Sequence, residues 1–248
     1  MPVMDEFKEE RAALKQGTFK QKARYVWDYY RWYFIGGAIA AVCLFTLVRD
    51  IVTHKDAGFY ACMLNGAQID VFAEETENMK NFAEYASIDT EEYQVLFDTS
   101  IQIGTPGADD YTSAQKLMIY IASQEIDVIA TDVNSMLKYA YQGNFADLTT
   151  MLSPEQMEKY KDSFYYLDKV VQTEYSELDS TEIMDTPLTY PDPTKPEEMT
   201  EPIPIGVKPG ASCPLLTEYA FNGDLFVGIV LNTTRPEKAL KFIDYVMQ

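Results

Sequence analysis

Short polar side chains follow four segments whose residue types indicate buried strands. The residues are Asn65, Ser100, Asp132, Asn134 and Asn232. Amide, hydroxyl and carboxylate groups can orient a small polar ligand through hydrogen bonds. In open α/β sheets ligands bind outside the carboxyl ends of the strands, where these residues are expected to lie. Three of them also have a structural interpretation, because Asp132 can cap a helix and Asn65 and Asn232 can form turns. We treat the five as candidate ligand-binding residues.

The residue sets of common catalytic sites are missing from the sequence. His54 is the single histidine, which removes Ser-His-Asp and Cys-His catalysis and H-E-x-x-H zinc chemistry. The chain has neither G-x-G-x-x-G nor G-x-x-x-x-G-K-[ST], the glycine-rich motifs that bind phosphates. We therefore expect no catalytic residue, no cofactor and no enzymatic activity.

Metal binding has weak candidates. No C-x-x-C is present, so a zinc knuckle is not expected. Asp109-Asp110 and the acids from Glu174 to Asp185 offer the oxygen ligands that calcium prefers. Neither stretch has EF-hand spacing, since the glycine of the sharp turn is missing. A solvated acidic surface is the preferred interpretation, and no metal ligand is predicted.

Two cysteines lie in the acidic body of the chain, at positions 62 and 213. A disulfide between them is an option if the body lies outside the cell. Two separately buried free cysteines are the alternative, which we favour.

The candidate ligand-binding residues need a scaffold, which the apolar pattern predicts. Asp70 and Asp132 are the expected N-caps of two helices. Strands that alternate with helices of ten to fifteen residues favour parallel strands joined by helical crossovers. The expected order is a strand at 57–64, a helix at 70–86, a strand at 93–103, a helix at 111–122, a strand at 126–130 and a helix at 132–141.

The second half of the chain is less regular. Ser153, Pro154 and Gln156 form a capping box that predicts a helix over 152–161. Residues 176–204 hold six prolines and many acids, which indicates a long irregular excursion or a crossing between two lobes. Beyond it we expect a strand at 203–207, a helix at 214–221, a strand at 225–231 and a helix at 237–247.

An uncharged apolar segment near the N-terminus predicts a membrane span. Residues 32–48 are 17 residues without a charge, about 26 Å of helix. Extension to residue 52 reaches the usual length of a transmembrane helix. Six Trp and Tyr residues crowd positions 25–33, as at membrane boundaries. A cleaved signal peptide would have a shorter preceding region and a small-residue cleavage site. A buried helix of a soluble domain would not need the aromatic cluster.

The charges divide at this segment. Five Lys/Arg lie between positions 15 and 31, and the positive-inside rule then places the N-terminus in the cytoplasm. Residues 1–49 carry a net charge of +3 and residues 50–248 a net charge of −22. A body with this much negative charge repels nucleic acid and anionic lipid. A nucleic-acid partner is therefore not expected. We predict a single-pass protein of the cell membrane: a basic and aromatic cytoplasmic tail (1–31), a transmembrane helix in the lipid bilayer (32–52) and an acidic extracytoplasmic α/β domain (56–248).

Two stretches resemble a known family. The first is KLMIYIASQEIDVIATDVNSMLKYAYQGNFADLTTMLSPEQ, residues 116–156, in which a strand ends at Asp132 and a helix leads to the turn GNFADLT at 143–149. The second, residues 232–247, contains PEKALKFI. Together they cover 57 of 248 residues and resemble the extracellular solute-binding proteins of ABC importers. Residues 20–37 are also similar to the anchors of membrane proteins from Gram-positive anaerobes.

This resemblance implies a periplasmic-binding-protein-like (type II) α/β domain, in a reduced form, behind one transmembrane helix. It implies non-catalytic binding of a small-molecule solute for transport or sensing, with a membrane transporter or sensor as partner. The chain departs from the family in size, because about 193 residues (56–248) are fewer than two full lobes need. Both tryptophans, Trp27 and Trp32, lie at the membrane segment, away from any sugar site. A scaffold that keeps the fold without a ligand pocket is therefore the alternative.

Overall fold

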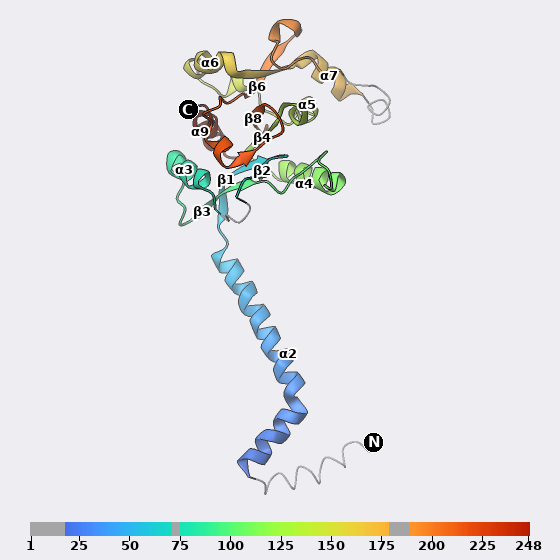
Figure 1. Ribbon diagram of the computed structural model, residues 1–248, viewed down its shortest axis with the longest axis vertical. Coiled ribbons are helices and arrows are strands. Elements are labelled where there is room, and N and C mark those ends of the chain that lie inside the picture. Colours follow the sequence, from blue (N-terminus) through green and yellow to red (C-terminus); the bar gives the residue numbers. More distant parts are fainter. Residues whose placement is uncertain (1–17, 71–74, 179–188) are drawn as a thin grey trace. The chain divides into compact units, whose positions relative to one another are not determined.

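The computed structural model describes residues 18–70, 75–178 and 189–248. The chain divides into two units, residues 1–54 and 55–248, which are described separately. Figure 1 labels their helices and strands.

The first unit contains the helix α2, Phe19–Thr53. Its segment Tyr30–Thr53 is long and apolar enough to cross a membrane, and it contains the span predicted at 32–52. Large apolar side chains on it, such as Ile39 and Phe45, are more than half exposed, which is the pattern expected for a helix that contacts lipid. Most of the predicted cytoplasmic tail, residues 1–17, lies outside the described residues.

The second unit is a mixed α/β domain. Its six-stranded sheet has the order β3-β1-β4-β8-β6-β5 in the described part of the chain. Strands β1, β3 and β4 are parallel, as predicted, whereas β8 is antiparallel to β4, β6 to β8 and β5 to β6. The strands are β1 Asp56–Met63, β3 Tyr93–Asp98, β4 Val128–Asp132, β5 Phe164–Asp168, β6 Pro202–Val207 and β8 Leu225–Ile229. The helices are α3 Glu77–Ala86, α4 Asp110–Ala122, α5 Val133–Tyr141, α6 Pro154–Tyr160, α7 Lys169–Glu177 and α9 Pro236–Val246.

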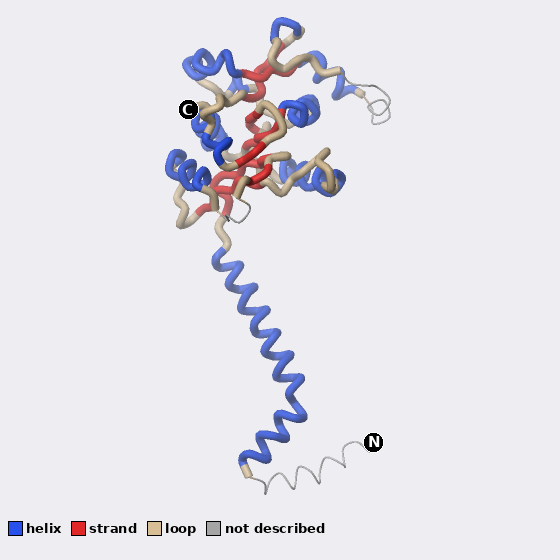
Figure 2. The backbone as a smooth tube through the Cα atoms, viewed as in Figure 1, coloured by secondary structure: helices blue, strands red, loops and turns tan. Residues whose placement is uncertain are grey.

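Helices cover both faces of the sheet, and the alternation of β1 shows why (Figure 2). Every second residue of a strand points to the same face. Phe59 packs on Phe82 of α3 and Phe242 of α9, with ring centroids 4.6 and 5.0 Å apart. On the other face Cys62 joins a second buried cluster, with side chains from α4 and α5. The continuous apolar run of β1 is thus a strand buried on both sides.

Several local predictions are confirmed. Asp132 caps α5 and accepts a hydrogen bond from the Ser135 amide. The capping box of Ser153 and Gln156 is present at the start of α6, with Pro154 in its first turn. Both body cysteines are free and buried, and they belong to clusters on opposite faces of the sheet.

Other predictions are wrong. Asp70 is not an N-cap, because Thr76 caps α3 in a capping box with Met79. The predicted helix at 214–221 is a short 3-10 helix, Pro214–Thr217, followed by β7, Tyr219–Ala220, which pairs with β2, Ala67–Gln68. Strand β5 and helix α7 were not predicted, and part of the excursion at 176–204 lies outside the described residues.

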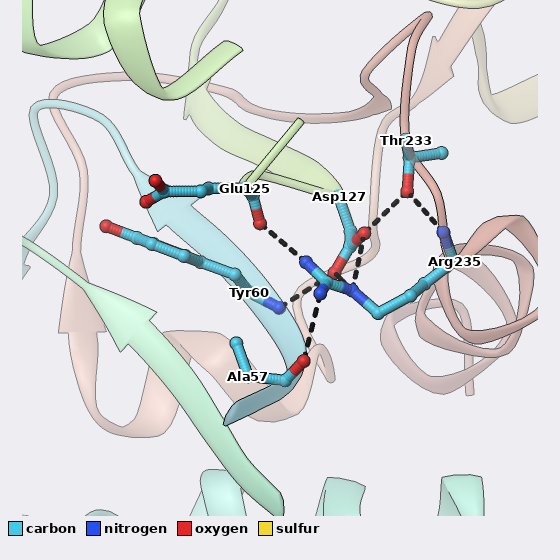
Figure 3. A network of polar contacts seen from close by, with 6 residues as sticks. All are labelled: Ala57, Tyr60, Glu125, Asp127, Thr233 and Arg235. Atoms are coloured by element: carbon cyan, nitrogen blue, oxygen red, sulfur yellow. Dashed lines mark hydrogen bonds and ion pairs between the residues drawn. The ribbon is translucent and has the colours of Figure 1, made fainter. Parts of the chain in front are cut away.

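A buried ion pair joins the middle strands to the C-terminal helix (Figure 3). The Asp127 side chain is fully buried and accepts hydrogen bonds from the Tyr60 amide at 2.9 Å, from Arg235 Nε at 2.8 and 3.0 Å and from the Thr233 hydroxyl. Arg235 also donates to the carbonyl oxygens of Ala57 at 2.9 Å and Glu125 at 2.6 Å. The guanidinium therefore joins β1 and the segment before β4 to the residue that precedes α9.

Without Arg235, the buried Asp127 carboxylate should lower the free energy of unfolding. Burial raises the pKa of Asp127, and hydrogen bonds from Thr233, Tyr60 and Arg235 oppose that rise. A folded-state pKa above the unfolded one means that stability falls as pH rises. We expect Arg235→Met to lower the free energy of unfolding by about 3–5 kcal/mol near neutral pH, and by less at about pH 4.5. Urea unfolding of the detergent-solubilised chain, followed by tyrosine near-ultraviolet circular dichroism, measures both values.

The matched control is Lys208→Met, which breaks the exposed Lys208–Asp224 ion pair. That change should cost less than about 1 kcal/mol at either pH. Equal losses for Arg235→Met at both pH values would show that the uncompensated Asp127 carboxylate is not the cause.

Candidate functional site

A polar cleft of about 460 Å³ lies at the carboxyl ends of the parallel strands β1 and β4. Residues from five chain segments converge on it: the end of β1, the loop after β3, the start of α4, the start of α5 and the loop before β8. The lining residues are Asn65, Ile103, Gly104, Thr105, Asp110, Asp132, Asn134, Ser135, Lys138, Tyr139 and Asn222. Three of the five predicted residues, Asn65, Asp132 and Asn134, are therefore in one place.

Asn65 holds the floor of the cleft together. It follows β1 with φ of +59°, a left-handed conformation that asparagine tolerates better than most residues. Its side-chain oxygen accepts the Ile103 amide at 2.7 Å, and its Nδ2 donates to the Ser135 hydroxyl at 2.8 Å. Asn65 therefore fixes the loop after β3 against the first turn of α5.

Asp132 completes this framework. Its carboxylate accepts hydrogen bonds from the Ser135 amide at 3.0 Å and the Ser135 hydroxyl at 2.7 Å. The hydroxyl can donate to Asp132 while it accepts from Asn65, so the three side chains form one ordered chain of hydrogen bonds. Asn65 and Asp132 are thus used structurally, and they hold the cleft in shape for its other groups.

Other polar groups of the cleft have no hydrogen bond within the described part of the chain. The Tyr139 side chain is 3% exposed and its hydroxyl has no partner among the described residues. Asn134 is exposed and makes no hydrogen bond to any described residue. Burial raises the pKa of Tyr139 to about 12, so its hydroxyl stays protonated and neutral at physiological pH. The exposed Asn134 side chain is therefore available to a ligand, whereas the Tyr139 hydroxyl is enclosed by the surrounding side chains.

The two remaining predicted residues lie away from the cleft. The Ser100 hydroxyl accepts from Lys116 Nζ at 2.5 Å. Lys116 also pairs with the Asp98 carboxylate at 3.6 Å. Asn232 lies beyond the opposite ends of the strands, near the start of β4. The reason is that β8 runs antiparallel to β4 and ends beside Val128. Its Nδ2 donates to the Ile121 carbonyl at 2.7 Å.

Several cleft residues were not singled out from the sequence as ligand contacts. Ser135 follows the predicted residue Asp132 by three positions, and Lys138 follows Asn134 by four. Helical spacing from Asp132 and Asn134 was a usable signal for these two. Asn222 had no such signal, because it lies in a loop far along the chain whose place only the fold determines.

Metal binding finds no support within the described residues, which contain no group of three or more His, Cys, Asp or Glu side chains able to hold an ion. Asp109, a calcium candidate from the sequence, caps α4 by accepting from the Thr112 amide at 3.1 Å. Hydrogen bonds from Thr112 lower the pKa of Asp109. Asp110 accepts the Gly104 amide at 2.8 Å. Part of the other candidate stretch, 174–185, lies outside the described residues.

Two tyrosine variants test whether the buried hydroxyls are unsatisfied. Tyr165 is 1% exposed and, like Tyr139, has a hydroxyl without a partner among the described residues, but it does not line the cleft. Removal of a buried, unpaired hydroxyl should raise the free energy of unfolding by about 1 kcal/mol. We expect this gain for Tyr139→Phe and Tyr165→Phe, measured by urea unfolding. A loss of stability in either variant would mean that its hydroxyl has a partner, such as a bound water.

Comparison with known proteins gives no relative: no family model, no curated protein and no solved structure matches this chain.

Proposed function

We propose that this chain is a membrane-anchored, non-catalytic binding protein whose acidic domain takes up a small polar solute in the cleft at the ends of β1 and β4. The observation that carries the proposal is the pairing of a fixed polar framework with unused groups. Asn65, Ser135 and Asp132 bond to each other, whereas the exposed Asn134 side chain beside them makes no hydrogen bond within the described residues.

The energetics favour a ligand at this position. The exposed Asn134 side chain can bond to a solute without first breaking a hydrogen bond within the described residues. The fixed framework beside it needs little ordering on binding. The cleft also lies outside the carboxyl ends of parallel strands, where open α/β sheets bind their ligands.

The resemblance to solute-binding proteins is part of this proposal. Parallel strands β3, β1 and β4 with helices on both faces agree with one lobe of a periplasmic-binding-protein-like (type II) domain. In the proposed form the protein is a reduced solute-binding protein, and its partner is a membrane transporter or a sensor. A single lobe cannot close on a solute with a second lobe of its own, so the partner would supply the covering surface.

The topology belongs to the same proposal. Helix α2 would span the cell membrane with the basic residues of positions 15–31 on the cytoplasmic side. The domain of residues 56–248, with its large negative charge, would then lie outside the cytoplasm.

A scaffold without a ligand is the second candidate, and one observation favours it. Helix α4 exposes Tyr111 (73%) and Ile119 (62%), with Met118 beside them. An exposed apolar helix face of this kind can serve as a protein contact. Absence of solute binding would shift the preference to this candidate.

Filling the cleft should abolish binding without unfolding the domain. We expect Asn134→Trp to remove the rise in unfolding temperature that a bound solute gives the full chain in nanodiscs. The screen covers neutral sugars, amino acids, short peptides and calcium. Asn81→Trp is the matched control, because Asn81 is also an exposed helical asparagine but lies on α3, outside the cleft. Wild-type chain that responds to no solute at millimolar concentration would contradict the proposal, as would equal loss in both variants.

The proposed topology predicts the products of limited proteolysis on intact cells. An impermeant protease should remove the C-terminal domain and leave an N-terminal fragment that contains α2. A tag placed before residue 15 should stay protected, while a tag after residue 248 should be lost. Protection of the C-terminal tag, with a cytosolic control protein intact and a surface control protein cleaved, would place the domain in the cytoplasm.

A further inference from the structure

The charged groups of the cleft suggest which solute it takes. They are Asp110, Asp132 and Lys138. The two carboxylate oxygens of the exposed residue Asp110 differ: Oδ1 accepts the Gly104 amide at 2.8 Å, and Oδ2 has no hydrogen bond within the described residues. The carboxylate of Asp132 is occupied by Ser135. Asp110 therefore offers the cleft one free anionic acceptor.

Lys138 is the complementary group. It is exposed on α5 and lines the cleft. Among the described residues no carboxylate lies within 4 Å of its Nζ. Its ammonium lies 6.0 Å from the centre of the Tyr139 ring. It offers the cleft one free cation.

The groups that can meet a solute come from two helices. Asn134 and Lys138 are four residues apart on one helix face, and both line the cleft. Asp110 comes from a different element, the first turn of α4. A solute in the cleft can thus meet an anionic acceptor from α4 and cationic and amide donors from α5.

From this arrangement we infer that the cleft binds a small zwitterion, an amino acid or a short peptide, with its ammonium at Asp110 and its carboxylate at Lys138 and Asn134. This inference rests on the proposed binding function and narrows its ligand class. A neutral sugar would leave both charges unpaired, and a simple anion would meet two carboxylates against one ammonium. A zwitterion matches both free groups with charge-assisted hydrogen bonds, which are the stronger kind.

Calorimetric titration of the full chain in nanodiscs tests the assignment with a matched set of probes. The set contains a pool of the protein amino acids, dialanine, N-acetyl-dialanine, dialaninamide and glucose. We expect binding of the amino-acid pool or of dialanine. Where dialanine binds, capping either of its charged ends should weaken binding about tenfold or more. The amino-acid and dialanine arms separate the two sources of the same chemistry.

Two variants assign the ends of the solute. Lys138→Gln should weaken the zwitterion about tenfold and remove the advantage of a free carboxylate, while Asp110→Asn should remove the advantage of a free ammonium. The control is Lys159→Gln, because Lys159 also lies in the last turn of a helix over a tyrosine ring but is outside the cleft. It should leave binding unchanged.

The outcomes separate this inference from the function beneath it. Binding of glucose with equal affinity in the wild type and in Lys138→Gln would overturn the zwitterion and leave solute binding intact. Binding of N-acetyl-dialanine as tightly as dialanine would do the same. If none of the probes gives a binding heat, both the zwitterion assignment and the proposed solute binding are overturned.

Discussion

The Asp127–Arg235 pair is the constraint on which the architecture of the domain depends. Asp127 belongs to the entry into β4, and its backbone bonds both neighbouring strands: its amide donates to Tyr60 at 2.9 Å and its carbonyl accepts from Val230 at 2.9 Å. Its carboxylate then holds Arg235, the residue before α9. Backbone and side chain together fix β1, β4 and the C-terminal segment near the amino-terminal ends of the parallel strands. Because the strands have a fixed register, this contact also sets where the carboxyl ends of β1 and β4 lie, at the cleft.

Local patterns predicted much of the fold, because most of its elements follow their own sequence. The apolar run of β1, the caps Asp132 and Ser153 and the amphipathic α9 need no distant residue to be recognised. Strand direction was different. The sequence of β8 is equally compatible with a parallel or an antiparallel place, and its position between β4 and β6 depends on tertiary pairing. Strand β5 is short and lies at an edge, which gives a weak pattern.

The candidate site shows the same division. Asn65 and Asp132 could be predicted from the sequence because they follow or end parallel strands, whose carboxyl ends lie on the same side of the sheet. Asn232 also follows a strand, but that strand is antiparallel, so Asn232 lies at the opposite ends of the strands. Ser100 is drawn aside by its amide, which donates to Asp98 at 2.7 Å. The unpaired hydroxyl of Tyr139 could not be predicted, because that property exists only after the surrounding side chains have been placed.

The position of β8 also affects how the domain can be made. This strand joins the parallel half of the sheet to the β6–β5 half, yet it is synthesised after both. Until residues 225–246 emerge, β4 and β6 each present an open edge, and the partner for Asp127 is absent. Vectorial synthesis would thus deliver two unfinished halves before the strand that unites them. In the proposed topology this delay suits export, because the polypeptide remains loosely structured while it passes through a translocation channel and locks only after its last helix has crossed.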